Sequence, residues 1–233
     1  MDGKELVSGA AYDVYMDIKK RTNGEIYFGV VGPVRTGKST FIKRFMELCV
    51  LPSMKDDNKR KRAQDELPQS SGGTTVMTVE PKFIPSEAAL ISPFEGINMK
   101  VRLVDCVGFM VEGANGHLDN GKERMVKTPW DTKEIAFSKA AEIGTKKVIN
   151  DHSTIGIVVT TDGSFGEISR ESYVPAEEQT IEELRTLGKP FVVVLNSEKP
   201  YSDETVSLAD RMMKKYQTPV IPVSCEQLRK EDI

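Results

Sequence analysis

Gly32-Pro33-Val34-Arg35-Thr36-Gly37-Lys38-Ser39 is the stretch of this 233-residue chain from which its fold can be inferred. An apolar run at 25–32 predicts a buried strand before it, and residues 39–50 after it have the apolar spacing of an amphipathic helix. The two glycines allow backbone conformations that bring several N–H groups together, and the helix N-terminus adds partial positive charge. A Gly-x4-Gly-Lys-Ser pattern between a strand and a helix predicts a phosphate-binding loop.

The chemistry of this loop is that of nucleotide triphosphate binding. Lys38 supplies a point charge for the β- and γ-phosphates, and the Ser39 hydroxyl is a ligand for Mg²⁺. Arg35 has two possible orientations, toward the phosphates of its own or a neighbouring nucleotide, or outward into solvent. We predict that nine consecutive residues contact the nucleotide: Gly32, Pro33, Val34, Arg35, Thr36, Gly37, Lys38, Ser39 and Thr40.

A second motif supports the first. The predicted strand at 99–105 ends in Asp105-Cys-Val-Gly108, an Asp-x-x-Gly pattern. Asp105 can hold Mg²⁺ through water from the side opposite Ser39, and Gly108 can offer its N–H to the γ-phosphate. We therefore predict Lys38 and Asp105 as catalytic residues, Ser39 and Asp105 as metal-binding residues, and Gly108 as a nucleotide contact.

A threonine between the two motifs should reach both Mg²⁺ and the γ-phosphate. Thr75 has the Gly-x-Thr spacing usual in switch segments, and Thr78 begins a predicted strand. Both stay open as catalytic candidates, with Thr75 as a metal ligand and Thr74 as a further possibility. Phe109 stands after Gly108, where many GTPases have the glutamine that orients the attacking water. Phenylalanine cannot do this, so slow hydrolysis is expected.

The segment Asn196-Ser197-Glu198-Lys199 bears on which base is bound. The motifs resemble the GTPase superclass, in which Asn-Lys-x-Asp at this place reads guanine. Asn196 and Ser197 are predicted nucleotide contacts, but Lys199 stands where the aspartate would accept two hydrogen bonds from guanine. A cation cannot accept them, so the sequence favours ATP. The alternative is that another residue keeps a guanine preference.

Alternation of strand and helix patterns predicts an α/β fold, a three-layer GTPase-like P-loop NTPase with a mostly parallel central sheet flanked by helices. Asn23-Gly24 separates a predicted helical leader, residues 1–24, from a P-loop domain at 25–233. Further strands are predicted at 76–84, 99–105, 154–160, 191–195 and 220–223, and helices at 134–150, 176–187 and 202–216. Loops are predicted at 52–73, 86–98, 106–130 and 162–175.

Composition excludes several classes of function. The net charge of −3 offers no basic excess, so nucleic acid is not expected as a partner. Three scattered cysteines and two histidines argue against zinc and fit a reducing cytosol. The N-terminus lacks the features of a signal peptide, and no apolar stretch approaches the ~20 residues of a membrane-spanning helix. Any membrane contact is therefore expected to be peripheral.

The closest resemblance is to one family. The strings at 29–43, 63–70, 77–83, 102–108, 152–156 and 160–164 resemble stage IV sporulation protein A, the spore-coat morphogenetic ATPases of endospore-forming bacteria. The resemblance covers essentially the whole chain. Members of the family are longer, and this chain resembles their N-terminal ATPase domain.

The resemblance implies Mg²⁺-dependent ATP hydrolysis that drives a conformational change and self-assembly at the base of the spore coat. It implies a cytoplasmic location in the mother cell, at the outer forespore surface. It places the ATP-binding lysine at Lys38, the strand-end aspartate at Asp105, and paired sensor threonines around Thr78, the second falling on Val79. Contacts with other coat proteins and with a small membrane-anchoring protein are expected mainly from regions outside this chain. A regulatory GTPase-type switch is the alternative function.

Overall fold

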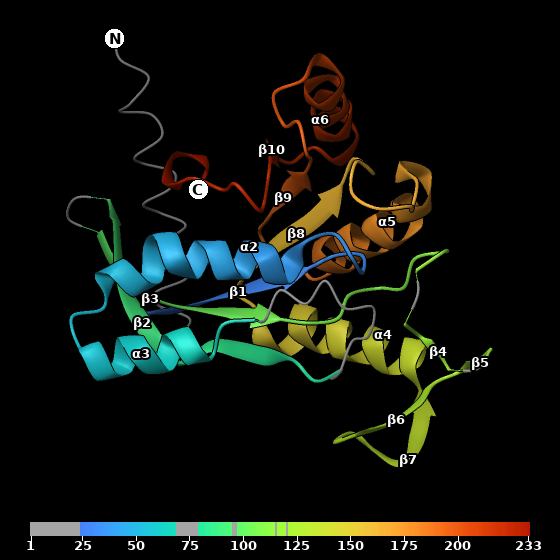
Figure 1. Ribbon diagram of the computed structural model, residues 1–233, viewed down its shortest axis with the longest axis horizontal. Helices are drawn as coiled ribbons and strands as arrows, with labels where there is room; N and C mark the ends of the chain where they lie inside the picture. The colour runs from blue at the N-terminus through green and yellow to red at the C-terminus, as the bar shows by residue number, and fades with distance from the viewer. Residues whose placement is uncertain (1–23, 69–78, 95–96, 115, 120) are drawn as a thin grey trace.

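The computed structural model describes residues 24–68, 79–94, 97–114, 116–119 and 121–233. Its centre is a six-stranded sheet in the order β10-β9-β8-β1-β3-β2 (Figure 1). Five strands run parallel, whereas β2 pairs antiparallel with β3 at one edge. The strand bounds are β1 Glu25–Val31, β2 Lys82–Phe94, β3 Ile97–Asp105, β8 Ile155–Thr161, β9 Phe191–Asn196 and β10 Val220–Val223. The predicted α/β architecture with a mostly parallel sheet is confirmed.

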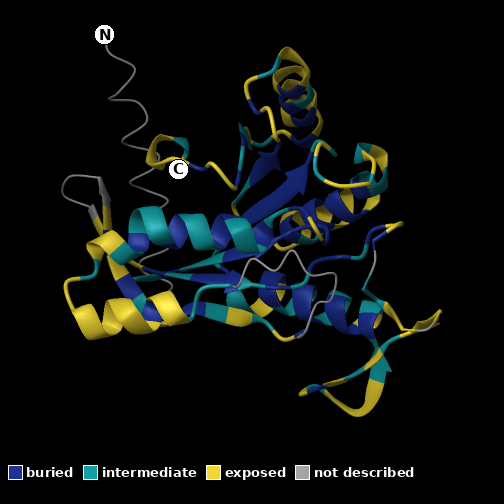
Figure 2. Ribbon diagram, viewed as in Figure 1, coloured by how far each residue is buried: buried dark blue, intermediate teal, exposed yellow. Residues whose placement is uncertain are grey.

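Helices cover both faces of this sheet, because alternate residues of each central strand bury side chains on opposite sides. In β1, Ile26 and Val30 pack in a core shared with α2, whereas Val31 packs with α5 and α6. Figure 2 shows β8 and β9, inside the sheet, in the dark blue of buried residues. The longer helices are α2 Lys38–Phe45, α3 Asp57–Asp65, α4 Phe137–Lys147, α5 Arg170–Thr186 and α6 Asp203–Tyr216.

Short helical segments continue two of these helices or join other elements. Five-residue π-helical segments directly follow α2 and α4, at Met46–Val50 and Val148–His152. Short 3-10 turns lie at Leu51–Ser53 and Lys230–Asp232. The predicted helix at 39–50 therefore corresponds to α2 together with the segment that extends it.

Helix α3 lies inside the predicted loop at 52–73, so the prediction was wrong there. The Asp56 carboxylate caps this helix by accepting hydrogen bonds from the N–H groups of Asn58 and Lys59. Ala63 is the one buried residue of the helix, and Figure 2 shows most of the rest exposed. A helix that buries so little has no apolar periodicity from which it could be recognised.

Strand β2 is longer than expected and includes most of the predicted turn at 86–98. Its register against β3 shifts between Ile84 and Ala89. The strand continues through this irregularity, which interrupts the strand pattern in the sequence and so looks like the end of a strand. The described part of the predicted strand at 76–84 begins at Val79, and pairing with β3 begins at Lys82.

The segment predicted as irregular, 106–130, contains strands of two small hairpins. These are β4 Leu118–Asp119 with β5 Lys122–Glu123, and β6 Met125–Thr128 with β7 Asp131–Ala136. Because β7 takes residues up to Ala136, α4 begins at Phe137, three residues later than the predicted helix. Figure 1 shows the hairpins projecting from one end of the molecule beside α4.

Helix α5 begins at Arg170, six residues before its predicted start, and includes Pro175. Pro175 is the sixth residue of the helix, so it removes an intrahelical hydrogen bond, and buried side chains on either side of it, such as Tyr173 and Ala176, pack the helix against the core. The predicted leader at 1–24 lies outside the described residues apart from Gly24, so that division stays a prediction. Within the part of the chain that the structure describes, no helix has the length and apolar character needed to cross a membrane.

Candidate nucleotide-binding site

The glycine loop connects β1 to α2 and requires both of its glycines. Gly32 and Gly37 have φ angles of 132° and 95°, a region that favours glycine. A Cβ atom on Gly32 would lie 2.3 Å from the Val159 carbonyl oxygen, and one on Gly37 would lie 2.5 Å from Nδ2 of Asn196. The loop is therefore fixed by close backbone approach to β8 and by a side chain at the end of β9.

Residues that follow β3 form backbone hydrogen bonds with the glycine loop. The N–H of Val34 donates to the Phe109 carbonyl at 2.9 Å, and the N–H of Phe109 donates to the Gly32 carbonyl at 3.2 Å. Inside the loop, the Thr36 hydroxyl donates to the Pro33 carbonyl at 3.0 Å. The Phe109 side chain is buried in the core, so it is not available to orient a water molecule.

Asn196 and Ser197 belong to the framework around the loop. Asn196 donates through Nδ2 to the Thr36 carbonyl at 3.0 Å and accepts through Oδ1 from the N–H of Cys225 at 2.9 Å. It thereby joins the glycine loop to the end of β10. The Ser197 hydroxyl is buried, lies 3.2 Å from the Thr205 hydroxyl and accepts from the N–H of Lys199 at 3.0 Å. Their direct contact with a nucleotide stays a prediction.

Lys38 places its ammonium group inside the loop. The side chain is buried, and Nζ donates to the Pro33 carbonyl at 2.5 Å. Burial lowers the pKa of Lys38, while the Cys106 thiol and the Asp105 carboxylate act in the opposite direction. A cation in contact with backbone carbonyls at a phosphate loop is suited to exchange them for phosphate oxygens, which carry full charge.

Ser39 and Asp105 meet at the edge of the loop. The Ser39 hydroxyl donates to Oδ2 of Asp105 at 3.0 Å. The other carboxylate oxygen, Oδ1, is buried and has no hydrogen-bond partner among the residues that the structure describes. Burial raises the pKa of Asp105, against the charge of Lys38 and the hydrogen bond from Ser39.

This pair of oxygen ligands fits Mg²⁺. The ion binds hard oxygen atoms and usually takes one or two carboxylates, with water and substrate phosphates completing its shell. Oδ1 of Asp105, which has no partner in the described part of the chain, is a buried acceptor of the kind that a cation or its water would satisfy. Among the described residues, no group of three acidic, histidine or cysteine side chains could hold a metal without a substrate.

Gly108 lies against the glycine loop, and its N–H has a partner within the protein, so its contact with a nucleotide stays a prediction. A Cβ atom on Gly108 would lie 2.3 Å from the Gly32 carbonyl oxygen and 2.6 Å from Nζ of Lys38. The N–H of Gly108 donates to the Thr145 hydroxyl on α4 at 3.1 Å. Thr145 carries no signal in the sequence that would indicate this contact, because it lies in an amphipathic helix without a motif.

Arg35 and Thr40 complete the predicted contact set. Arg35 has a left-handed backbone with φ of 61° and is the one exposed residue of the fully described segment 31–40. Burial raises the pKa of Tyr173 on α5, and the positive charge of Arg35 opposes this rise, which places the guanidinium near that tyrosine. Thr40 lies half-buried in the first turn of α2.

The switch threonines Thr75 and Thr78, with the alternative Thr74, lie outside the described residues, so their roles stay predictions. Val79, the first described residue after them, is buried. Its carbonyl oxygen lies 2.5 Å from the point where a Cβ atom on Gly144 of α4 would stand. This close approach places Val79, the residue after the predicted switch threonines, against the same helix that holds Gly108.

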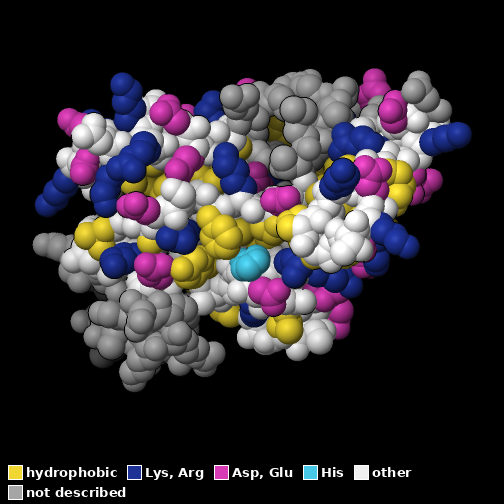
Figure 3. Space-filling view, turned by 90° about the horizontal axis from the view of Figure 1, so that it is seen from below, with side chains coloured by type: hydrophobic (Ala, Val, Ile, Leu, Met, Phe, Trp, Pro, Cys, Tyr) yellow, Lys and Arg dark blue, Asp and Glu magenta, His cyan; other side chains and the backbone are white. Residues whose placement is uncertain are grey.

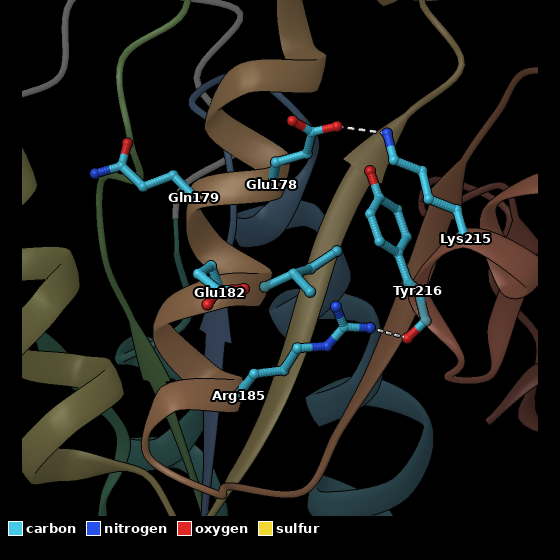
Figure 4. Close-up of a pocket in the computed structure, with 7 residues that line it drawn as sticks. Glu178, Gln179, Glu182, Arg185, Lys215 and Tyr216 are labelled. Atoms are coloured by element: carbon cyan, nitrogen blue, oxygen red, sulfur yellow. Dashed lines mark hydrogen bonds and ion pairs between the residues drawn. The ribbon is translucent and has the colours of Figure 1, made fainter.

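A surface groove of about 440 Å³ lies elsewhere, between α5 and α6 (Figure 4). Lys215 pairs with Glu178 across it, and Arg185 donates to the Tyr216 carbonyl. None of the predicted nucleotide contacts lines this groove. On the face shown in Figure 3, basic and acidic side chains are interspersed, which does not favour an extended phosphate backbone there.

The chain is similar to one known family over nearly all of its length. The family model described as stage IV sporulation protein A, ATPase domain, matches residues 10–233. Stage IV sporulation protein A of Clostridioides difficile (strain 630) is 56% identical over 221 residues, and that of Bacillus anthracis is 53% identical over the same length. Each match covers 95% of this chain and 45% of the relative, so the chain spans a little under half the length of these relatives.

Solved structures give a weaker likeness. A GTP-binding protein from the archaeon Sulfolobus solfataricus, solved in complex with GDP, is 18% identical. The match covers 98% of this chain and 59% of that one, with a TM-score of 0.46. At this score the fold assignment depends on the strand order of the chain itself.

Proposed function

The chain belongs to the family of stage IV sporulation protein A ATPase domains, and on this premise we propose that it binds a nucleotide triphosphate with Mg²⁺ and hydrolyses its terminal phosphoanhydride. The observation that carries the proposal is that Lys38, Ser39 and Asp105 lie together at the glycine loop. The Lys38 ammonium lies inside the glycine loop, and the Ser39–Asp105 pair lies at its edge, with one carboxylate oxygen that no described residue hydrogen-bonds.

The proposed reaction is in-line attack of water on the γ-phosphoryl group. Lys38 would hold the β- and γ-phosphates and offset the charge that develops on them. Ser39 and Asp105 would hold Mg²⁺, which supplies further neutralisation of phosphate charge when bound. Because Phe109 is buried, the attacking water would be positioned by backbone groups or by a switch threonine. Slow turnover is the expected consequence.

Phosphate release tests this proposal. Wild type should release phosphate from a triphosphate, whereas Lys38→Ala and Asp105→Asn should not exceed background. Lys43→Ala is the matched control, because Lys43 is a partly buried lysine of the same helix that lies outside the predicted contact set. Wild-type turnover in Lys38→Ala would overturn the assignment. Equal loss in Lys43→Ala would show a general effect on folding.

ATP is the proposed substrate. The polar atoms of Asn196 and Ser197 are engaged by the protein, whereas the side chains of Glu198 and Lys199 are exposed beside them. Guanine needs a carboxylate acceptor at the position of Lys199, and leaving its two donors unpaired would cost affinity. Direct competition between ATP and GTP decides the matter. A clear preference for GTP would favour the switch-type alternative, and Lys199→Asp should move the preference toward GTP.

The biological part of the proposal is self-assembly. We infer that hydrolysis drives a conformational change and polymerisation at the base of the spore coat, in the mother-cell cytoplasm at the outer forespore surface. Family membership supports this. We expect contacts with other coat proteins and with a small membrane-anchoring protein mainly through regions of the longer relatives that lie outside the given sequence. Sedimentation of a full-length protein with ATP or with a non-hydrolysable analogue tests it: equal polymer with both would separate assembly from hydrolysis.

A further inference from the structure

Thr145 is a completely buried residue of α4 whose hydroxyl hydrogen-bonds two backbone groups and also lies beside the Cys106 thiol. It donates to the Ala141 carbonyl at 2.8 Å and accepts from the N–H of Gly108 at 3.1 Å. A hydroxyl has a single proton, so the bond to Ala141 fixes Thr145 as the acceptor toward Gly108. The helix thus holds the amide of the Asp-x-x-Gly motif through a side chain far from the glycine loop in sequence.

Gly108 lies beside the predicted phosphate position, so its bond to Thr145 bears on nucleotide binding. Gly108 is pressed against the Gly32 carbonyl and the Lys38 ammonium, the two groups that border the predicted phosphate position. The proposed function assigns the same N–H to the γ-phosphate. One N–H cannot make a strong bond to both acceptors, so Thr145 and the γ-phosphate compete for it. A diphosphate has no γ-phosphate and leaves the bond to Thr145 undisturbed.

Moving the Gly108 N–H from Thr145 to the γ-phosphate costs little free energy. When Gly108 turns away, Thr145 keeps its bond to Ala141, so its hydroxyl is not left without a partner. The exchange therefore costs one neutral hydrogen bond, and the gain is a bond to a charged oxygen. The balance favours a triphosphate but is reduced by the competing acceptor.

Gly144, the residue before Thr145, links α4 to the chain just before β2. Gly144 packs against the Val79 carbonyl, and the Trp130 ring lies 3.8 Å from the point where its Cβ atom would stand. Consecutive residues of α4 therefore contact the chain before β2 and the chain after β3. At its N-terminal end, α4 joins the β6–β7 hairpin, where the N–H of Phe137 donates to the Arg124 carbonyl at 2.8 Å.

We propose that Thr145 is a positioning residue, which holds the Gly108 N–H in competition with the γ-phosphate and thereby sets how strongly the site prefers a triphosphate to a diphosphate. This inference depends on the proposed nucleotide site.

The test is the isosteric change Thr145→Val, which removes the acceptor and preserves the shape. Its matched control is Thr180→Val on α5: Thr180 is equally buried, and its hydroxyl makes only the equivalent bond, to the Ala176 carbonyl at 2.7 Å. Calorimetry with Mg²⁺ would measure the affinities of the analogue AMP-PNP and of ADP for both variants and for wild type. Thr145→Val should raise the ratio of AMP-PNP to ADP affinity by about 2- to 10-fold, the value of one neutral hydrogen bond.

Three further results complete the test. Thr180→Val should leave the ratio as in wild type, and Thr145→Ser, which keeps the hydroxyl, should do the same. A ratio in Thr145→Val that is unchanged or lower, with ADP binding intact, would overturn the role of Thr145. If wild type binds neither nucleotide, it is the proposed function that fails.

A measurement on wild type keeps the inference testable if Thr145→Val does not fold. The amide resonance of Gly108 should move when AMP-PNP is added and should stay close to its original position with ADP. Equal movement with both nucleotides would overturn the proposal, since it would mean that the amide does not respond to the γ-phosphate.

Discussion

The Ser39 hydroxyl donates to the Asp105 carboxylate across 3.0 Å, which ties the start of α2 to the last residue of β3. The second carboxylate oxygen is buried without a hydrogen-bond partner in the described part of the chain. Asp105→Asn keeps the shape but removes the charge that a divalent cation needs. We expect the Mg²⁺ concentration for half-maximal nucleotide binding to rise roughly 10- to 100-fold.

A magnesium titration with a fluorescent nucleotide measures this effect. Asp65→Asn, an exposed aspartate at the end of α3, is the control and should behave as wild type. A magnesium dependence in Asp105→Asn equal to that of wild type would remove Asp105 from the metal site.

Arg35 and Gln217 are the non-glycine residues of the described chain with positive φ, at 61° and 46°. A left-handed conformation costs an L-residue roughly 1–2 kcal/mol, and glycine avoids this cost. Glycine also loses more backbone entropy on folding, which offsets about half of the gain from the substitution. Urea unfolding should therefore find Arg35→Gly and Gln217→Gly as stable as wild type or up to about 1 kcal/mol more stable.

Turnover should separate these two positions. Gln217 ends α6, away from the glycine loop, so Gln217→Gly should hydrolyse nucleotide at the wild-type rate. Loss of a charge-assisted contact to phosphate should slow Arg35→Gly and Arg35→Ala about tenfold or more. Wild-type rates in both Arg35 variants would mean that this side chain is simply solvated.

A buried ion pair within α5 is hydrogen-bonded to β8 and to α6. Glu177 is fully buried and accepts from Arg170 at 2.7 and 2.8 Å, from the Thr160 hydroxyl at 2.5 Å and from the Tyr216 hydroxyl at 2.6 Å. Arg170→Met would leave a buried carboxylate without its cation, so the free energy of unfolding should fall by about 3–5 kcal/mol.

Lys215→Met is the comparison for that variant, because Lys215 pairs with Glu178 on the exposed side of α5. Breaking an exposed pair should cost no more than about 1 kcal/mol. Adding Glu177→Gln to Arg170→Met should recover part of the loss. A change in Arg170→Met as small as that in Lys215→Met would show that the pair does not stabilise the fold.

The three thiols should differ in reactivity. Burial raises the pKa of Cys106 to about 11 and that of Cys225 to about 12, whereas Cys49 is only half-buried. At pH 8 a thiol with the pKa of Cys106 is ionised in roughly one molecule per thousand, and the thiolate is the reactive form. Iodoacetamide should label Cys49 first, as read by mass spectrometry. Early labelling of Cys106 in folded protein would contradict this burial.

The same thiols predict a dependence of stability on pH. Between the ordinary value of 9.0 and about 11, the unfolded chain releases the Cys106 proton and the folded chain retains it. The folded state then binds more protons, so stability declines as pH rises through that window. Cys106→Ser should weaken the decline measured by urea unfolding at pH 9 and pH 10.5.

Local patterns were sufficient for much of the fold. The strands before the glycine loop and at 99–105, 154–160, 191–195 and 220–223 were all found within a few residues, because continuous apolar runs bounded by turns are distinctive. Helix α3 was missed because it buries little. The start of α5 was missed because Pro175 and the glycine-rich segment before the helix have the composition of a loop. The hairpins of 118–136 were missed because strands this short carry no recognisable alternation.

The sequence by itself determined which residues can hold a polyphosphate and a cation, because the loop chemistry of Gly32 to Ser39 and the strand-end Asp105 are local features. Only the tertiary structure decided what holds those residues in place. Asn196 meets the loop across 160 positions, Cys225 meets Asn196 across 29, and Thr145 meets Gly108 across 37. No periodicity encodes such pairs, because each depends on how separately formed strands and helices pack around one sheet.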